Sequence, residues 1–298
     1  MGGALLVIWG MTAWAIFTPT QTAYGCASYP ANPAYAYSLN NSPNVNSGTQ
    51  VGAGNFTYAG NAAVAPALTV GGDNAVTLDG TGDRMNMNSH AGGTNLNAGQ
   101  ATQLRTYMIW FNATTTTGNR QIWEHGGATN GAGMYIQNGT LYGGVWKNDT
   151  TLSFLSLPVT AGNTYFAVLQ YDPAATGVLT LYVNSTVTST TGIGATNNGT
   201  NANAIGGVNG NTRRHDASTG TADFQGVIDD FRVYYSIMPI STLNTIFVPG
   251  GGSGCHPTAV SLSGWSTAVG SAAWFLLIPA TLLTAGTAVA LRRRAPIF

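Results

Sequence analysis

A strand-like run near the C-terminal end of the chain constrains the fold more than any other feature. Residues 224–235 read Phe-Gln-Gly-Val-Ile-Asp-Asp-Phe-Arg-Val-Tyr-Tyr. Because side chains alternate across a strand, the odd-numbered residues from Phe231 to Tyr235 are expected on one face, with Asp229 beside them. The even-numbered residues are expected on the opposite face. One largely apolar face and one polar face indicate a strand that is packed on a core.

Further strand-like runs precede this one along the chain. They are rich in Val, Ile, Tyr, Phe and Thr and are separated by clusters of Gly, Asn and Asp; they lie at 75–87, 106–111, 120–126, 133–146, 164–172 and 178–184, and a short Ile205-Gly-Gly element follows. Asn138-Gly139 is a strong signal for a tight β-hairpin. No long amphipathic helix pattern occurs before residue 260. The pattern predicts an all-β fold with two packed antiparallel sheets.

The order of these segments resembles that of the laminin-G-like, concanavalin A-like jelly roll over residues 34–247. The resemblance implies a jelly-roll domain, assigned here to residues 26–248, and a role in adhesion or recognition. Two functions are compatible with it. One is a binding module for a glycan or cell-surface component, and the other is a structural accessory subunit of a larger membrane complex.

The composition and the small number of acidic residues argue against two classes of function, nucleic-acid binding and catalysis. Charged residues make up 7% of the chain and the formal net charge is zero, so there is no basic footprint for nucleic acid. Glu124 is the only glutamate, and no carboxylate lies two or five residues from it, as the paired acids of a glycosidase would require. His125 has no nucleophile motif beside it. We therefore expect no enzymatic activity and no catalytic residue.

Candidate ligand-binding residues lie in two places. Trp146 is expected to be the most exposed aromatic residue, available for stacking on a sugar, with Asn148 nearby for hydroxyl contacts. Arg213 and Arg214 lie in a charged loop, 209–216, on an otherwise neutral surface. That loop is either a contact for a glycan or partner, or simply a solvated loop.

Calcium is the one cofactor that the sequence suggests. The resemblance implies a structural calcium ion, with Asp229 as its ligand on the closing strand. Asp79 and Asp83, in the turn Asp-Gly-Thr-Gly-Asp, form a second candidate set of oxygen ligands. The alternative is that these three carboxylates cap turns and pair with Arg84 or Arg232.

Both ends of the chain carry membrane signals. Residues 268–291 hold no charge and would span about 36 Å as a helix, and Arg292, Arg293 and Arg294 follow. This predicts a transmembrane helix over 265–291, a cytoplasmic tail over 292–298 and an extracytoplasmic domain in the periplasm or at the cell surface. The tail resembles the C-terminal sorting segments of exported bacterial proteins, and we expect it to be retained as an anchor. Residues 249–264 read as a Gly-rich linker.

The N-terminal segment and the two cysteines leave alternatives open. Residues 1–25 are either a signal peptide or a short uncleaved hydrophobic helix. Cys26 and Cys255 flank the predicted domain, so a disulfide between them would close the sandwich in an oxidising compartment. The alternatives are two unpaired thiols or a lipid on Cys26.

Overall fold

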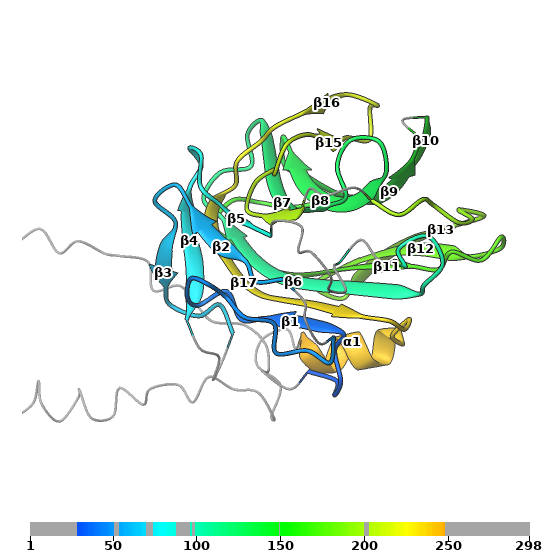
Figure 1. The fold of residues 1–298 in the computed structure, drawn as a ribbon, viewed down its shortest axis with the longest axis horizontal. Coiled ribbons are helices and arrows are strands. Elements are labelled where there is room, and N and C mark those ends of the chain that lie inside the picture. The colour runs from blue at the N-terminus through cyan, green and yellow to red at the C-terminus, as the bar shows by residue number, and fades with distance from the viewer. Residues whose placement is uncertain are drawn as a thin grey trace, which may run out of the picture.

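The chain folds as a two-layer β-sandwich. The computed structural model describes residues 29–50, 54–69, 74–87, 96, 99–148, 150–199 and 203–247. An eight-stranded and a seven-stranded sheet lie face to face, and all their strand pairs are antiparallel (Figure 1). The predicted all-β sandwich of two antiparallel sheets is therefore confirmed.

The eight-stranded sheet forms one layer. Its order is β13 (Thr186–Thr191), β12 (Val178–Val183), β11 (Thr164–Tyr171), β6 (Arg105–Ala113), β17 (Gln225–Tyr234), β4 (Ala75–Asp79) and β3 (Ala63–Ala65), and β1 (Tyr35–Tyr37) also pairs with β17. A short helix, α1 (Ile240–Ile246), covers the outer face of this sheet (Figure 1).

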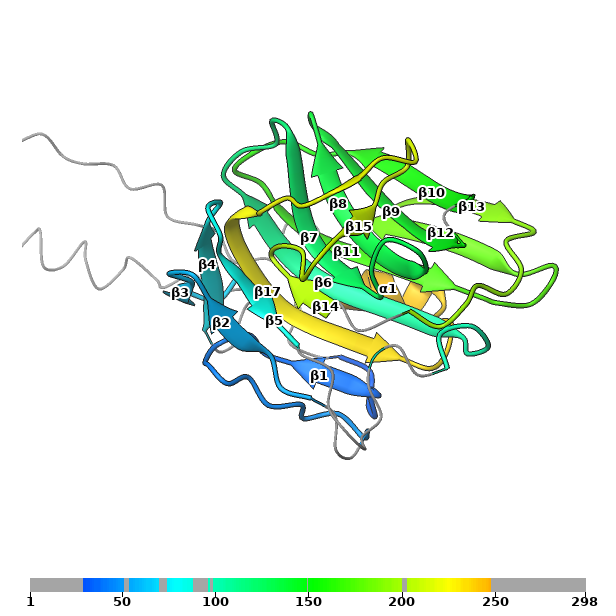
Figure 2. The same ribbon diagram turned by 45° about the horizontal axis from the view of Figure 1, so that its top comes forward.

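The seven-stranded sheet forms the other layer. Its order is β10 (Thr151–Pro158), β9 (Thr140–Lys147), β8 (Gly131–Gln137), β7 (Asn119–His125), β14 (Asn203–Ile205), β5 (Arg84–Asn86) and β2 (Thr57–Ala59). The predicted hairpin is the β8–β9 connection, where Asn138 and Gly139 both have positive φ, 48° and 83°. A separate hairpin, β15 (Thr212–Arg213) with β16 (Thr219–Gly220), lies over the outer face of this sheet (Figure 2).

Strand β6 shows how alternation divides the apolar residues between two clusters. Ile109 and Phe111 belong to the core between the sheets, together with Trp123 and Leu169 of other strands. Met108, Trp110, Phe166, Tyr182, Leu243 and Ile246 form a second buried cluster beneath α1. The outer face of the eight-stranded sheet is thus packed against a helix.

The closing strand β17 departs from the predicted alternation. Its register with β6 shifts between Asp229 and Arg232, and Asp230 has a φ of 49°, which together mark a β-bulge. As a result Ile228 and Phe231 both point into the core between the sheets. Asp229 Oδ2 instead accepts a hydrogen bond of 2.8 Å from the backbone N–H of Leu68, which belongs to the cluster beneath α1. The prediction that Asp229 shares a face with Phe231 and Val233 is wrong.

The predicted membrane segments and both cysteines lie outside the described residues. They are residues 1–25, the linker 249–264, the helix 265–291, the tail 292–298, Cys26 and Cys255. Within the part of the chain that the structure describes, no helix is long and apolar enough to cross a bilayer.

Gly226 should be the position where β17 is least tolerant of a side chain. It has a φ of 143°, and a Cβ there would overlap the carbonyl oxygen of Asn112 on β6. We expect Gly226→Ala to lower the free energy of unfolding by about 3 kcal/mol, measured by urea denaturation. Gly118 has a φ of 71° with nothing near its added Cβ. Gly118→Ala is the control and should cost only about 1 kcal/mol; equal losses would show that the contact with β6 is unimportant.

Candidate functional site

The outer face of strands β8, β9 and β10 is the candidate ligand-binding surface. The strand registers place Gln137 opposite Thr140, Tyr135 opposite Tyr142, and Gly144 opposite Phe154. Their neighbours Met134, Ile136, Leu141 and Val145 point the other way, into the core. The outer positions carry no charged side chain; they are Gly131, Gly133, Tyr135, Gln137, Thr140, Tyr142, Gly144, Trp146, Leu152, Phe154, Ser156 and Pro158.

Glycines make the floor of this face. A Cβ added to Gly144 would overlap the ring of Phe154, and a Cβ on Gly131 or Gly133 would come within 2.6 or 3.3 Å of the Trp146 indole. The two rings therefore lie over bare backbone, and they stack with centroids 5.9 Å apart and planes at 6°. A flat aromatic surface on one face of a sheet follows from this glycine spacing.

Trp146 does not have the exposure predicted for it. Its side chain is 1% exposed, and its indole N–H donates a 2.8 Å hydrogen bond to the carbonyl oxygen of Gly127. The ring fills the glycine floor, where a sugar cannot stack on it. Tyr142 and Phe154 are the partly exposed rings of this face instead. Sequence reasoning missed Phe154. Its place on this face depends on its register with Gly144, and neighbouring residues in the sequence do not reveal that register.

The β15–β16 hairpin places a histidine on this aromatic face. The imidazole of His215 stacks on Tyr142, with centroids 3.9 Å apart and planes at 8°. Its Nδ1 is hydrogen-bonded to the hydroxyl of Tyr135, which also accepts a 3.1 Å hydrogen bond from the backbone N–H of His215. Burial raises the pKa of Tyr135, so the phenol stays neutral.

The two predicted ligand arginines serve the hairpin and its neighbouring loop. Arg213 donates from Nε to the carbonyl oxygen of Ala128 at 3.2 Å and from Nη1 to that of Ala217 at 2.8 Å. Arg214 is 7% exposed and donates to the carbonyl oxygen of Thr221 at 3.1 Å. These contacts fix the hairpin. Direct binding of a ligand by either arginine stays a prediction.

Asn148 directly follows β9 and is hydrogen-bonded to asparagines of two other segments. Its Oδ1 accepts a 2.6 Å hydrogen bond from Asn197, and its backbone N–H donates to Asn130 Oδ1 at 3.0 Å.

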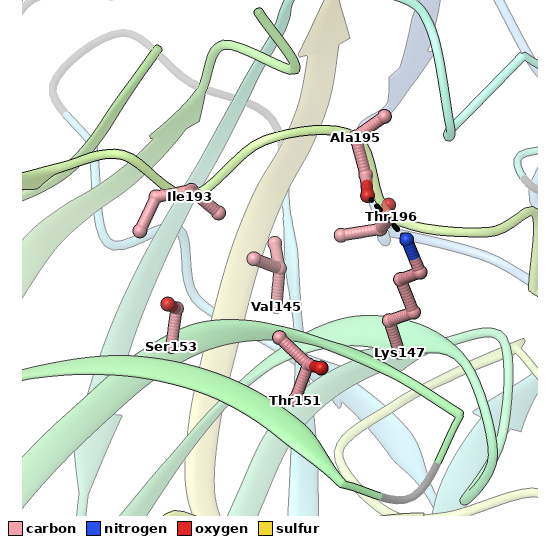
Figure 3. Close-up of a pocket in the computed structure, with 7 residues that line it drawn as sticks. All are labelled: Val145, Lys147, Thr151, Ser153, Ile193, Ala195 and Thr196. Atoms are coloured by element: carbon pink, nitrogen blue, oxygen red, sulfur yellow. Dashed lines mark hydrogen bonds between the residues drawn. The ribbon is translucent and has the colours of Figure 1, made fainter. Parts of the chain in front are cut away.

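A small pocket lies beside this strand. The pocket is lined by Val145, Lys147, Thr151, Ser153, Ile193, Ala195 and Thr196, with Lys147 donating to the carbonyl oxygen of Ala195 at 3.2 Å (Figure 3). Its volume of about 10 Å³ suits one water molecule and no sugar.

Glu124 and His125 are neighbours in sequence but point to opposite faces of β7. Glu124 pairs with Gly133 of the outer face, is 2% exposed, and accepts hydrogen bonds from the N–H groups of Gly127 (3.3 Å) and Asn209 (3.2 Å). Burial raises its pKa to about 8. His125 is buried, lies 3.0 Å by Nδ1 from the Tyr107 hydroxyl, and has a pKa lowered by burial. The two do not form an acid–base pair.

Two of the candidate calcium ligands, Asp79 and Asp83, are hydrogen-bonded by protein donors. Asp83 accepts hydrogen bonds of 2.7 Å from the N–H groups of Asn61 and Asp79, and Asp79 accepts from Asn61 Nδ2 and from the N–H of Thr81. These bonds lower the pKa of Asp79. Arg232 pairs with Asp230, at 2.9 Å.

No group of three His, Cys, Asp or Glu side chains among the described residues is arranged to hold a metal ion. Asp79 and Asp83 cap a turn, as the alternative expects, and Asp229 accepts a hydrogen bond from the backbone N–H of Leu68. These residues do not make a fitting metal site by themselves, and calcium binding stays a prediction.

The two packed antiparallel sheets define the class of the protein as a β-sandwich. Residues 79–239 match the concanavalin A-like lectin/glucanases superfamily (Laminin_G_3), and since this is more than half of the chain, the protein belongs to that family. No protein with curated annotation matches the chain.

Several solved structures share the fold. One is domain 4 of AbnA, an extracellular arabinanase from Geobacillus stearothermophilus, in complex with arabinotriose. Its TM-score is 0.54 at 15% identity, and the alignment covers 72% of this chain and 98% of that one. The botulinum neurotoxin serotype D ligand-binding domain in complex with N-acetylneuraminic acid has a TM-score of 0.53 at 12% identity. The alignment covers 72% of this chain and half (50%) of the toxin domain. At these identities the likeness shows the fold alone.

Glu124 should make the stability of the protein fall with rising pH. Its pKa of about 8 in the folded state lies above its usual value, so its stabilising contribution is present below about pH 4 and is lost as the pH rises through 8. Glu124→Gln cannot ionise. Relative to this variant, the wild type should lose on the order of 3 kcal/mol of unfolding free energy between pH 4.5 and 7, measured by urea denaturation.

The control for this comparison is Asp216→Asn. Asp216 is exposed and its pKa is lowered, chiefly by a hydrogen bond from Ser218, so its carboxyl is ionised above pH 5 in both folded and unfolded protein. The unfolding free energies of the control and the wild type should therefore change in parallel with pH above pH 5. A Glu124→Gln curve that also runs parallel to the wild type would contradict a buried, neutral Glu124.

Proposed function

We propose that this protein is a non-catalytic carbohydrate-binding module whose ligand lies on the outer face of strands β8, β9 and β10. The observation that carries the proposal is the aromatic face, where the partly exposed ring of Phe154 lies over Gly144 and the partly exposed ring of Tyr142 lies on the neighbouring strand. Aromatic rings with polar groups at their edges suit a ligand that has both C–H faces and hydroxyl groups.

The polar groups that the proposal needs lie on the same face. Gln137 and Thr140 are partners at the β8–β9 end, and Ser156 lies opposite Tyr142 on β10. Amide and hydroxyl side chains both donate and accept hydrogen bonds, as sugar hydroxyls do. A neutral glycan therefore meets matching groups here without losing an ionic contact to desolvation.

The solved structures of similar fold support a carbohydrate ligand. One was determined with arabinotriose and another with N-acetylneuraminic acid. The family also includes glucanases, so catalysis is the competing function. A glycosidase needs two carboxyl groups that reach the bond to be cleaved. Glu124 is 2% exposed and is held by two backbone N–H groups, which favours a structural role for this acid.

The cellular setting of the module rests on the sequence. We propose that it is displayed outside the cytoplasm by the apolar segment 265–291, with Arg292–Arg294 on the cytoplasmic side. A lectin at a cell surface needs its ligand face directed away from the anchor. The linker 249–264 supplies the freedom of orientation for this.

Phe154→Ala is the direct test of the proposed ligand face. The variant removes a stacking ring while leaving the inner face of β10 intact. We expect it to weaken binding to the neutral glycan that the wild type selects from an immobilised polysaccharide array by about 10-fold, corresponding to about 1.4 kcal/mol. Val187→Ala, on the exposed edge strand of the other sheet, is the control and should bind as the wild type does. Unchanged binding by Phe154→Ala would exclude this face.

A further inference from the structure

His215 occupies the position on Tyr142 that a ligand ring would take. The imidazole lies parallel to the Tyr142 ring at 3.9 Å and is at the same time hydrogen-bonded to the hydroxyl of Tyr135. A stacking face with a hydroxyl at its edge is also what a sugar ring requires. The hairpin therefore fills, with its own side chain, a place that is built for a flat polar ring.

The hairpin that carries His215 is separate from the sheet beneath it. Within the described chain, β15 and β16 pair only with each other. Its contacts to neighbouring segments include His215 on Tyr135 and Tyr142, and Arg213 on the carbonyl oxygen of Ala128. A two-stranded hairpin is only marginally stable alone. It can therefore move off the aromatic face without breaking a strand pair of either sheet.

A buried polar atom without a hydrogen-bond partner lies on the strand next to Tyr135. Gln121 is the register partner of Tyr135 on β7 and is 1% exposed. Its Nε2 donates to the carbonyl oxygens of Trp123 and Met134, but its Oε1 has no hydrogen-bond partner. A buried acceptor left without a donor costs about 1–3 kcal/mol. A hydroxyl group reaching this spot would satisfy it.

We propose that Tyr142, Tyr135 and Gln121 form a second ring-binding subsite that His215 closes, and that its ligand is an uncharged sugar ring of a longer glycan. The proposal rests on the proposed function and extends it. Tyr142 and Phe154 are diagonal neighbours on adjacent strands, about 7–8 Å apart, so one oligosaccharide reaches both. The outer positions of β8–β10 carry no charged side chain, and Arg214 and Asp216 of the hairpin act on Tyr135 with opposite sign, so the subsite offers no net charge to a ligand that carries carboxylates.

Two variants of His215 separate the open from the closed subsite. His215→Ala removes the ring from Tyr142, whereas His215→Phe keeps an aromatic ring over it. The full chain in detergent is titrated with xylo-, manno-, cello- and arabino-oligosaccharides of two to five rings, and affinity is measured by calorimetry. We expect His215→Ala to bind five rings about 10-fold more tightly than two, while the wild type and His215→Phe bind both with similar affinity.

Further variants show whether the gain arises at the subsite. Adding Tyr142→Ala to His215→Ala should abolish the preference for long chains. If His215→Ala fails to fold, judged by thermal denaturation, Arg213→Ala tests the same idea. It frees the hairpin from Ala128 without touching a ring, and should give a smaller preference for long chains.

The outcomes distinguish this inference from the function on which it rests. Binding by the wild type with no change in His215→Ala would overturn the subsite and leave the module intact. Loss of binding in His215→Ala, with binding kept in His215→Phe, would make His215 part of the binding surface and also overturn its role in closure. If no variant binds any oligosaccharide of the panel, both the proposed function and the subsite are wrong.

Discussion

The pairing of β17 with β6 is the constraint on which the rest of the structure depends. These strands are distant in sequence, yet they lie side by side at the centre of the eight-stranded sheet. β6 contributes Ile109 and Phe111 to the core between the sheets and Trp110 to the cluster beneath α1. Fixing its register therefore fixes both apolar clusters at once. A slip of one residue would exchange the two faces.

The bulge in β17 is held by the polar groups that it brings together. Asp230, at φ 49°, accepts hydrogen bonds from Tyr29 (2.8 Å) and from Arg232 (2.9 Å), and Trp110 donates from its indole N–H to the Tyr29 hydroxyl at 2.8 Å. The Arg232 guanidinium lies 3.8 Å above the Tyr29 ring. A buried carboxylate persists because it is paired and hydrogen-bonded. These same contacts fasten the segment at Tyr29 to the sheet and compensate for the strained backbone.

The strands could be predicted because their sequence signals are local. The bulge in β17 could not be predicted, because it depends on the register with β6. Alternation and Asn138-Gly139 identify strands and a hairpin from neighbouring residues alone. Alternation also assigned Asp229 to the wrong face, since nothing in Asp229-Asp230 tells which residue is the extra one. The burial of Trp146 has the same kind of cause. Whether a tryptophan is exposed depends on Gly131 and Gly133 of the adjacent strand, and so on a register that only the fold supplies.

The candidate ligand face could not be predicted either, because it is formed by segments that are distant in sequence. Stacking of His215 on Tyr142 joins two segments whose sequences carry no mutual signal. The sandwich has two outer faces. Trp110, Phe166 and the helix α1 pack on the outer face of the eight-stranded sheet. The outer face of β8–β10 has a lighter cover, a short hairpin held by side chains. The outer positions of these strands carry no charged side chain, so the face suits ligands recognised by shape and hydroxyl groups.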